Sequence, residues 1–78
     1  MLRVTTESGS VHEIDQEEGR ARRLPGTKAG GLHADGDWIT SASALKPVIG
    51  RHFSYVYRLE NGRPVIRTTT PVVLIEEI

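Results

Sequence analysis

The residues best suited to chemistry lie between Arg20 and Trp38, in the stretch RARRLPGTKAGGLHADGDW. Its GTKAGG run is similar in composition to a phosphate-binding loop. The P-loop pattern, however, has four residues between its glycines, a lysine after the second glycine and a helix behind it. Here Lys28 lies inside the glycine spacing, and the residues that follow predict no helix. We therefore expect no nucleotide to bind this run.

The HADGDW run offers His33, Asp35 and Asp37 as metal ligands at alternate positions. Alternate side chains share a face only when the segment is extended, and Asp35-Gly36 is typical of a turn. A calcium loop would also need a glutamate further along the chain, and none stands at the required place. We expect neither a metal nor another cofactor, and we expect residues 25–36 to form a long, mobile loop.

Catalytic groups are present but show no catalytic spacing. The three histidines, His12, His33 and His52, are scattered along the chain. A serine–histidine–aspartate triad is defined by geometry, and nothing in the order of these residues favours one. Small barrels are filled by their own side chains and leave little room for a substrate. The sequence therefore predicts that the protein is not an enzyme.

Length and composition narrow the remaining functions. The chain has 78 residues, no cysteine, and ten basic against ten acidic residues. Disulfides are excluded, the core is small, and no overall field attracts nucleic acid or an anionic membrane. The longest apolar run, residues 72–75, is far shorter than the ~20 residues of a membrane-spanning helix. We expect one domain over residues 1–78, in the cytoplasm.

Alternating segments separated by turn residues predict strands. LRVTT and SVHEID flank ESG, whose glycine fits a three-residue hairpin loop that places Arg3 opposite Glu13. QEEG then turns the chain into RARRL, which sets Glu13 against Arg22. Asp15 meets Arg20 in the same register. The neighbouring acidic and basic segments are thereby explained as cross-strand pairs.

A second hairpin is predicted around Asn61-Gly62, the preferred pair for a two-residue turn. This turn places Tyr57 opposite Ile66 and buries one face of the hairpin, made of Phe53, Tyr55, Tyr57, Leu59 and Ile66. The outward face then carries an amphipathic patch made of Val56, Arg58, Val65 and Arg67.

The whole pattern predicts an all-β fold. DGDWIT restarts a strand, SASALK suggests one helical turn before Pro47, and VVLIEEI makes a last strand. About six short strands with short connections close most economically as a small SH3-like barrel or a rolled antiparallel meander.

The last strand is apolar on both faces. Val72 and Leu74 alternate with Val73 and Ile75, and a strand of this kind is usually covered on both sides. A single barrel interior covers only one of the two pairs. We expect a homodimer, or a binding partner, to cover Val73 and Ile75.

Several stretches resemble small proteins of unknown function encoded by actinobacterial phages and prophages. They are VTTESGSVHEID, the arginine-rich strand, LHADGDWI, PVIGR and RTTTPVVLIEE, which follow one another over nearly the whole chain. The resemblance implies a small phage product that acts in the bacterial cytoplasm or in the particle by binding a host or phage macromolecule.

The predicted function is therefore that of a phage-encoded binding module with a protein partner. Its interaction residues are predicted to be Val56, Arg58, Val65, Arg67, Val73 and Ile75. One alternative is a nucleic-acid-binding barrel that uses Arg20, Arg22, Arg23 and Lys28. Another is a minor structural component of the phage particle.

Overall fold

Six antiparallel strands form the part of the chain that the structure describes. This computed structural model describes residues 1–24 and 36–78, and neither range contains a helix. The strands are β1 (Leu2–Thr6), β2 (Val11–Asp15), β3 (Arg20–Leu24), β4 (Ile39–Thr40), β5 (His52–Arg58) and β6 (Pro64–Glu77). The all-β prediction is confirmed.

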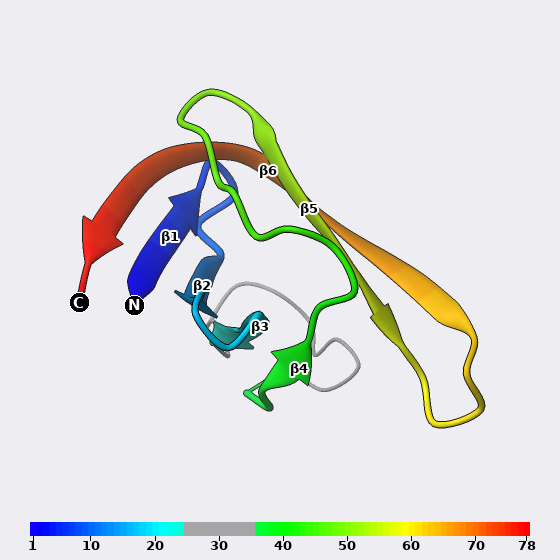
Figure 1. The fold of residues 1–78 in the computed structure, drawn as a ribbon. Helices are drawn as coiled ribbons and strands as arrows, with labels where there is room; N and C mark the ends of the chain where they lie inside the picture. The colour runs from blue at the N-terminus through cyan, green and yellow to red at the C-terminus, as the bar shows by residue number, and fades with distance from the viewer. Residues whose placement is uncertain (25–35) are drawn as a thin grey trace.

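The strands close into a nearly complete barrel. Their spatial order is β4-β3-β2-β1-β6-β5, so β4 and β5 are the two edge strands. The long strand β6 arches over the molecule and pairs with β1 near its C-terminal end and with β5 near its start (Figure 1). This arrangement is that of a small SH3-like barrel. Between the edge strands lies a seam, where the N–H of Ala42 donates to the carbonyl of Val56 at 2.7 Å.

The first two hairpins have the predicted registers. Arg3 lies opposite Glu13, and Glu13 lies opposite Arg22. Glu7, Ser8 and Gly9 form the first loop, in which the N–H of Gly9 donates to the carbonyl of Thr6 at 2.9 Å. Gly9 has a φ of 89°, a left-handed conformation that glycine adopts at little cost.

The Asn61-Gly62 hairpin has a different register from the predicted one. Its loop contains three residues, 60–62, because the N–H of Leu59 donates to the carbonyl of Arg63 and the N–H of Gly62 to that of Leu59, both at 2.9 Å. Tyr57 consequently faces Val65, and Val56 faces Ile66. A shift of one residue exchanges the two faces of a strand. Ile66, predicted to be buried, is 68 % exposed, whereas Arg67 points inward and is 8 % exposed.

A bulge in β6 also changes the prediction for the last strand. Thr5 lies opposite Leu74 and Thr6 opposite Val72, so Val73 is an extra residue on β6. A bulge of this kind shifts the alternation of side chains. Val72 is buried and Ile75 packs against the core, while Val73 and Leu74 are exposed. The predicted pair of Val73 and Ile75 on one outward face is therefore wrong.

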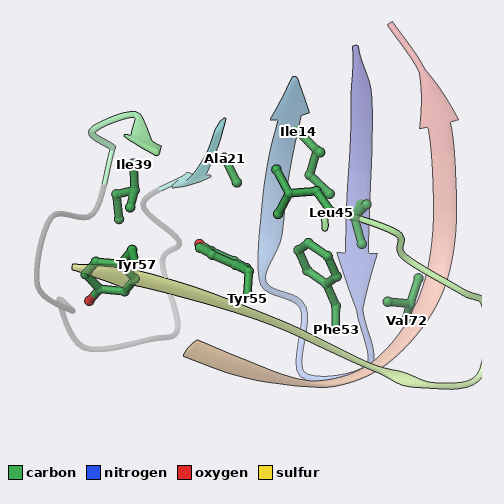
Figure 2. Packing of buried hydrophobic residues seen from close by; sticks show 9 residues of the cluster. Ile14, Ala21, Ile39, Leu45, Phe53, Tyr55, Tyr57 and Val72 are labelled. Atoms are coloured by element: carbon green, nitrogen blue, oxygen red, sulfur yellow. The ribbon is translucent and has the colours of Figure 1, made fainter. Parts of the chain in front are cut away.

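The core is built across the barrel from β5. Phe53, Tyr55 and Tyr57 project from successive inward positions of β5 towards Ile14, Ala21 and Ile39 on the opposite strands (Figure 2). The burial predicted for these three aromatic residues is confirmed, and Leu59 is half-buried. The residues buried in this core are Val4, Ile14, Ala21, Ile39, Leu45, Phe53, Tyr55, Tyr57 and Val72.

The segment between β4 and β5 is irregular, and the predicted helical turn at residues 41–46 is wrong. The hydroxyl of Ser41 donates to the carbonyl of Ser43 at 2.7 Å and accepts from the N–H of Ser43 at 3.1 Å. Short polar side chains that bond the neighbouring backbone in this way compete with helix formation. Leu45 then enters the core, and Ile49 forms a parallel bridge with Val72.

The two ends of the chain lie side by side (Figure 1). The N–H of Ile78 donates to the carbonyl of Met1 at 2.8 Å, which extends the pairing of β1 with β6. Across residues 1–24 and 36–78, there is no helix of the length and apolarity needed to cross a membrane.

Candidate binding site

The outward arginines of β3 are engaged by carboxylates. Arg22 donates from Nε to Oε1 of Glu13 at 2.7 Å, and Arg3 donates to Oε2 of the same carboxylate at 3.3 Å. Arg20 lies 3.4 Å from Asp15. These are the cross-strand pairs that the predicted register implies. They leave the guanidinium groups of Arg20 and Arg22 already bonded within the protein.

The same contacts lower the pKa values of both carboxyls. For Glu13 the hydrogen bond from Arg22 contributes most to the lowered pKa; burial opposes it, and Arg3 adds to it. For Asp15 the largest cause of the lowered pKa is the backbone N–H of Glu18, with a further contribution from Arg20. Both carboxylates are therefore held in their charged form at neutral pH.

Trp38 lies against the same two arginines. The guanidinium carbons of Arg20 and Arg22 are 4.6 and 4.7 Å from the centroid of its ring, within cation–π range. These contacts fix the orientation of the indole just before the short edge strand β4. Trp38 is half-buried.

The predicted nucleic-acid strip is not assembled on one surface. Arg20 and Arg22 lie on the outer face of β3, but Arg23 lies on the inner face and is buried. Successive side chains of a strand point to opposite faces of the sheet, so the consecutive residues Arg22 and Arg23 cannot share one face. Lys28 lies outside the described residues, as do His33, Asp35 and all but the last residue of the predicted loop at 25–36. Gly36, the last residue of that loop, has a φ of 85°.

The predicted amphipathic patch on the hairpin is also divided. Val56 and Arg58 face outward with Ile66, whereas Val65 packs against the core and Arg67 is buried. Arg67 donates to the hydroxyl of Tyr55 at 3.2 Å. The predicted patch requires a two-residue turn, and the three-residue loop removes it.

A polar cluster surrounds Arg67 inside the barrel. Arg67, Arg23 and His12 line a small hollow of about 200 Å³ together with serine and threonine hydroxyls. Guanidinium and hydroxyl groups can bind anions. All three charged or titratable members, however, have bonding partners within the protein. We therefore regard the cluster as part of the internal structure.

The seam between the edge strands holds a larger hollow of about 830 Å³. One side is formed by residues 38–42, which include Trp38 and Thr40, and the other by residues 57–61, which include Tyr57, Arg58 and Leu59. Pockets of roughly 300–1,000 Å³ with aromatic walls and a few polar groups are typical of binding sites. We call this region, residues 38–42 and 57–61, the seam site.

Sequence reasoning did not find the seam site. Tyr57 and Leu59 are predicted on one face of the hairpin and Trp38 lies in another predicted strand. Their meeting depends on how the barrel closes. The available signal is the only tryptophan of the sequence, Trp38, in the predicted strand DGDWIT.

The protein is thus a small SH3-like barrel that is not fully closed, and the seam site is an aromatic hollow between its two edge strands. No protein-family model, curated protein or solved structure matches the chain.

Proposed function

We propose that this protein is a phage-encoded binding module that binds a polypeptide segment of a host or phage protein at the seam site. It acts in the cytoplasm of the bacterial host and performs no catalysis. The resemblance to small phage proteins supports the biological setting, and the seam site supports the mode of action.

The observation that carries the proposal is the composition of the seam site. Trp38 and Leu59, both half-buried, provide aromatic and apolar surface, and the buried Tyr57 lines the hollow with them. Arg58 and Glu60 provide exposed charged groups. Aromatic residues and arginine are enriched where proteins bind one another. The arginines that hold Trp38 reduce the entropy that the indole loses on binding.

A random peptide library displayed on phage, selected against the purified protein, tests this proposal. We expect selected peptides to quench or enhance the fluorescence of Trp38 and to lose affinity by about tenfold or more in Trp38→Ala, as expected of an aromatic contact. Thr40→Arg, at an exposed position of the seam site, should block binding without removing a core residue. Ile66→Ala, an exposed apolar change away from the seam site, is the control.

Two results would contradict the proposal. One is a set of selected peptides that bind Trp38→Ala and Thr40→Arg as tightly as the unchanged protein. The other is a library from which no peptide is enriched, because a surface built to hold polypeptide should select some sequences over others.

The nucleic-acid alternative receives less support from the geometry, because Arg20 and Arg22 already bond carboxylates. Titration with single-stranded oligonucleotides at two salt concentrations separates the functions, since phosphate contacts weaken steeply with salt. A role as a minor particle component stays a prediction, which proteomics of purified particles would test.

A further inference from the structure

The outer edge of β5 carries backbone groups that face the seam. Successive residues of a strand direct their N–H and C=O groups to opposite edges. At Val56 these groups cross the seam: the carbonyl accepts from the N–H of Ala42 at 2.7 Å, and the N–H donates to the hydroxyl of Ser43 at 3.1 Å. Leu59 instead bonds within its own hairpin, to Arg63.

Arg58 lies two residues after Val56, so its N–H and C=O face the seam as well. Arg58 and Pro64 face each other as a non-hydrogen-bonded pair, so the main chain of Arg58 makes no ladder bond to β6. In the described part of the chain, no residue bonds the main chain of Arg58 across the seam. Arg58 also lines the seam site. Among residues 1–24 and 36–78, the strand edge is thus bonded across the seam at Val56 and open at Arg58.

We propose that the seam site binds its polypeptide by strand addition, with the incoming segment running antiparallel to β5 and one of its residues paired with Arg58. This inference rests on the proposed function and adds the binding mode and the chemistry of the partner. In an antiparallel pair, one residue both donates to and accepts from its opposite residue. Strand addition gives affinity through the main chain and specificity through alternate side chains.

The alternation also defines the partner sequence. The side chain opposite Arg58 lies on the outer face beside the exposed guanidinium, which is held near the turn by its bond to the carbonyl of Gly62 at 3.1 Å. An acidic residue at that place forms a cross-strand ion pair. The residues on either side of it point to the face of Tyr57 and Leu59 and enter the seam site. The partner is therefore an extended apolar–acidic–apolar segment without proline at the central residue.

The test uses peptides selected against the intact protein, with each backbone nitrogen methylated in turn. Methylation removes one N–H donor and keeps every side chain. We expect a loss of affinity of about tenfold at the acidic residue, as for one hydrogen bond at the upper end of the usual range, and smaller losses at its two neighbours. Peptides without an acidic residue between apolar ones should be rare among those selected.

A charge exchange tests the pairing with Arg58. Arg58→Glu should weaken the selected peptides by about threefold or more, and replacement of the acidic peptide residue by lysine should restore the affinity. Arg63→Glu, an exposed change on the same hairpin outside the seam site, is the matched control and should have no such effect.

The outcomes separate strand addition from the proposed function. Peptides that need Trp38 but tolerate methylation at every position would refute strand addition and leave the proposed function intact. Rescue of Arg58→Glu by lysine at some other peptide position would refute the stated pairing. Peptides indifferent to both Trp38→Ala and Thr40→Arg would refute the proposed function itself.

Discussion

Arg58 and Arg67 belong to the same hairpin, and burial gives them different roles. Arg67 is 8 % exposed and donates to the hydroxyl of Tyr55, while its guanidinium lies 5.4 Å from the ring of Tyr57. Arg58 is exposed. We expect Arg67→Ala to lower the free energy of unfolding by about 2–3 kcal/mol, since it removes a buried charged hydrogen bond. Arg58→Ala should change it by less than about 0.5 kcal/mol. Urea denaturation measures both, and equal losses would contradict the observed register.

Glu13 should contribute to a loss of stability in acid. Its pKa is lowered in the folded protein from an ordinary value near 4.5, chiefly by Arg22. A carboxyl whose folded pKa lies below its unfolded one stabilises the fold above the unfolded value, and this contribution disappears as the pH falls through the folded value. We expect the protein to lose stability below about pH 4.5, in the range where unfolded glutamate takes up its proton.

Glu13→Gln is the variant that checks this pH dependence. It should be less stable than the unchanged protein at pH 7 by roughly 1–3 kcal/mol, as for a charged hydrogen bond, and should lose less stability between pH 7 and pH 3. Thermal unfolding at several pH values supplies the measurement. Two parallel stability curves would show that Glu13 does not carry the acid sensitivity.

Among the elements, the β5–β6 hairpin offers the most direct structural test. The chain has no cysteine, so a pair can be introduced without competing thiols. Val56 and Ile66 face each other on the outer surface, and a directly opposed pair of this kind lies within disulfide range. The double variant Val56→Cys/Ile66→Cys should oxidise to an intramolecular disulfide. Val56→Cys/Arg67→Cys, the pair that a two-residue turn would oppose, should keep its thiols, and thiol titration with mass spectrometry would reveal the reverse.

The sequence predicted the elements well and one register poorly, for a local reason. Glu7-Ser8-Gly9 and Glu60-Asn61-Gly62 are loops of the same length with the same first and last residues. Asn-Gly is the stronger two-residue signal, and it outweighed this internal similarity. Gly62 has a φ of 83°, close to the 89° of Gly9. Comparison of the two loops would have given the correct register and placed Arg67 inside.

The bulge at Val73 and the seam site could not be predicted from the sequence, for a different reason. Both arise from closure, since β6 must bend to reach β1 and β5 together. Apolar residues occur at every position from 72 to 75, so alternation provides no signal for the extra residue. The seam site likewise depends on the whole sheet, because the closure of the sheet decides how β4 and β5 lie relative to each other.

At the scale of the whole molecule, the formally neutral chain pairs the arginines on the outer face of β1 and β3 with carboxylates of β2. Arg3 and Arg22 share Glu13, and Arg20 lies beside Asp15. The outer face of β1, β2 and β3 therefore presents a compensated surface instead of a basic one. Recognition through shape and main-chain bonds at the seam suits such a molecule better than attraction to phosphates.

Self-association is the remaining prediction for the whole molecule. The bulge in β6 replaces the predicted interface pair, Val73 and Ile75, with Val73 and Leu74. Val73 and Leu74 are adjacent and 53 % and 46 % exposed. Neighbouring exposed apolar residues often mark an interface, and a small domain gains stability by covering them. We expect a homodimer in sedimentation velocity at tens of micromolar, and a monomer for Val73→Lys/Leu74→Lys. Ile66→Lys, at another exposed apolar position of β6, should leave the dimer intact. If the unchanged protein sediments as a monomer, Val73 and Leu74 do not bind a second copy.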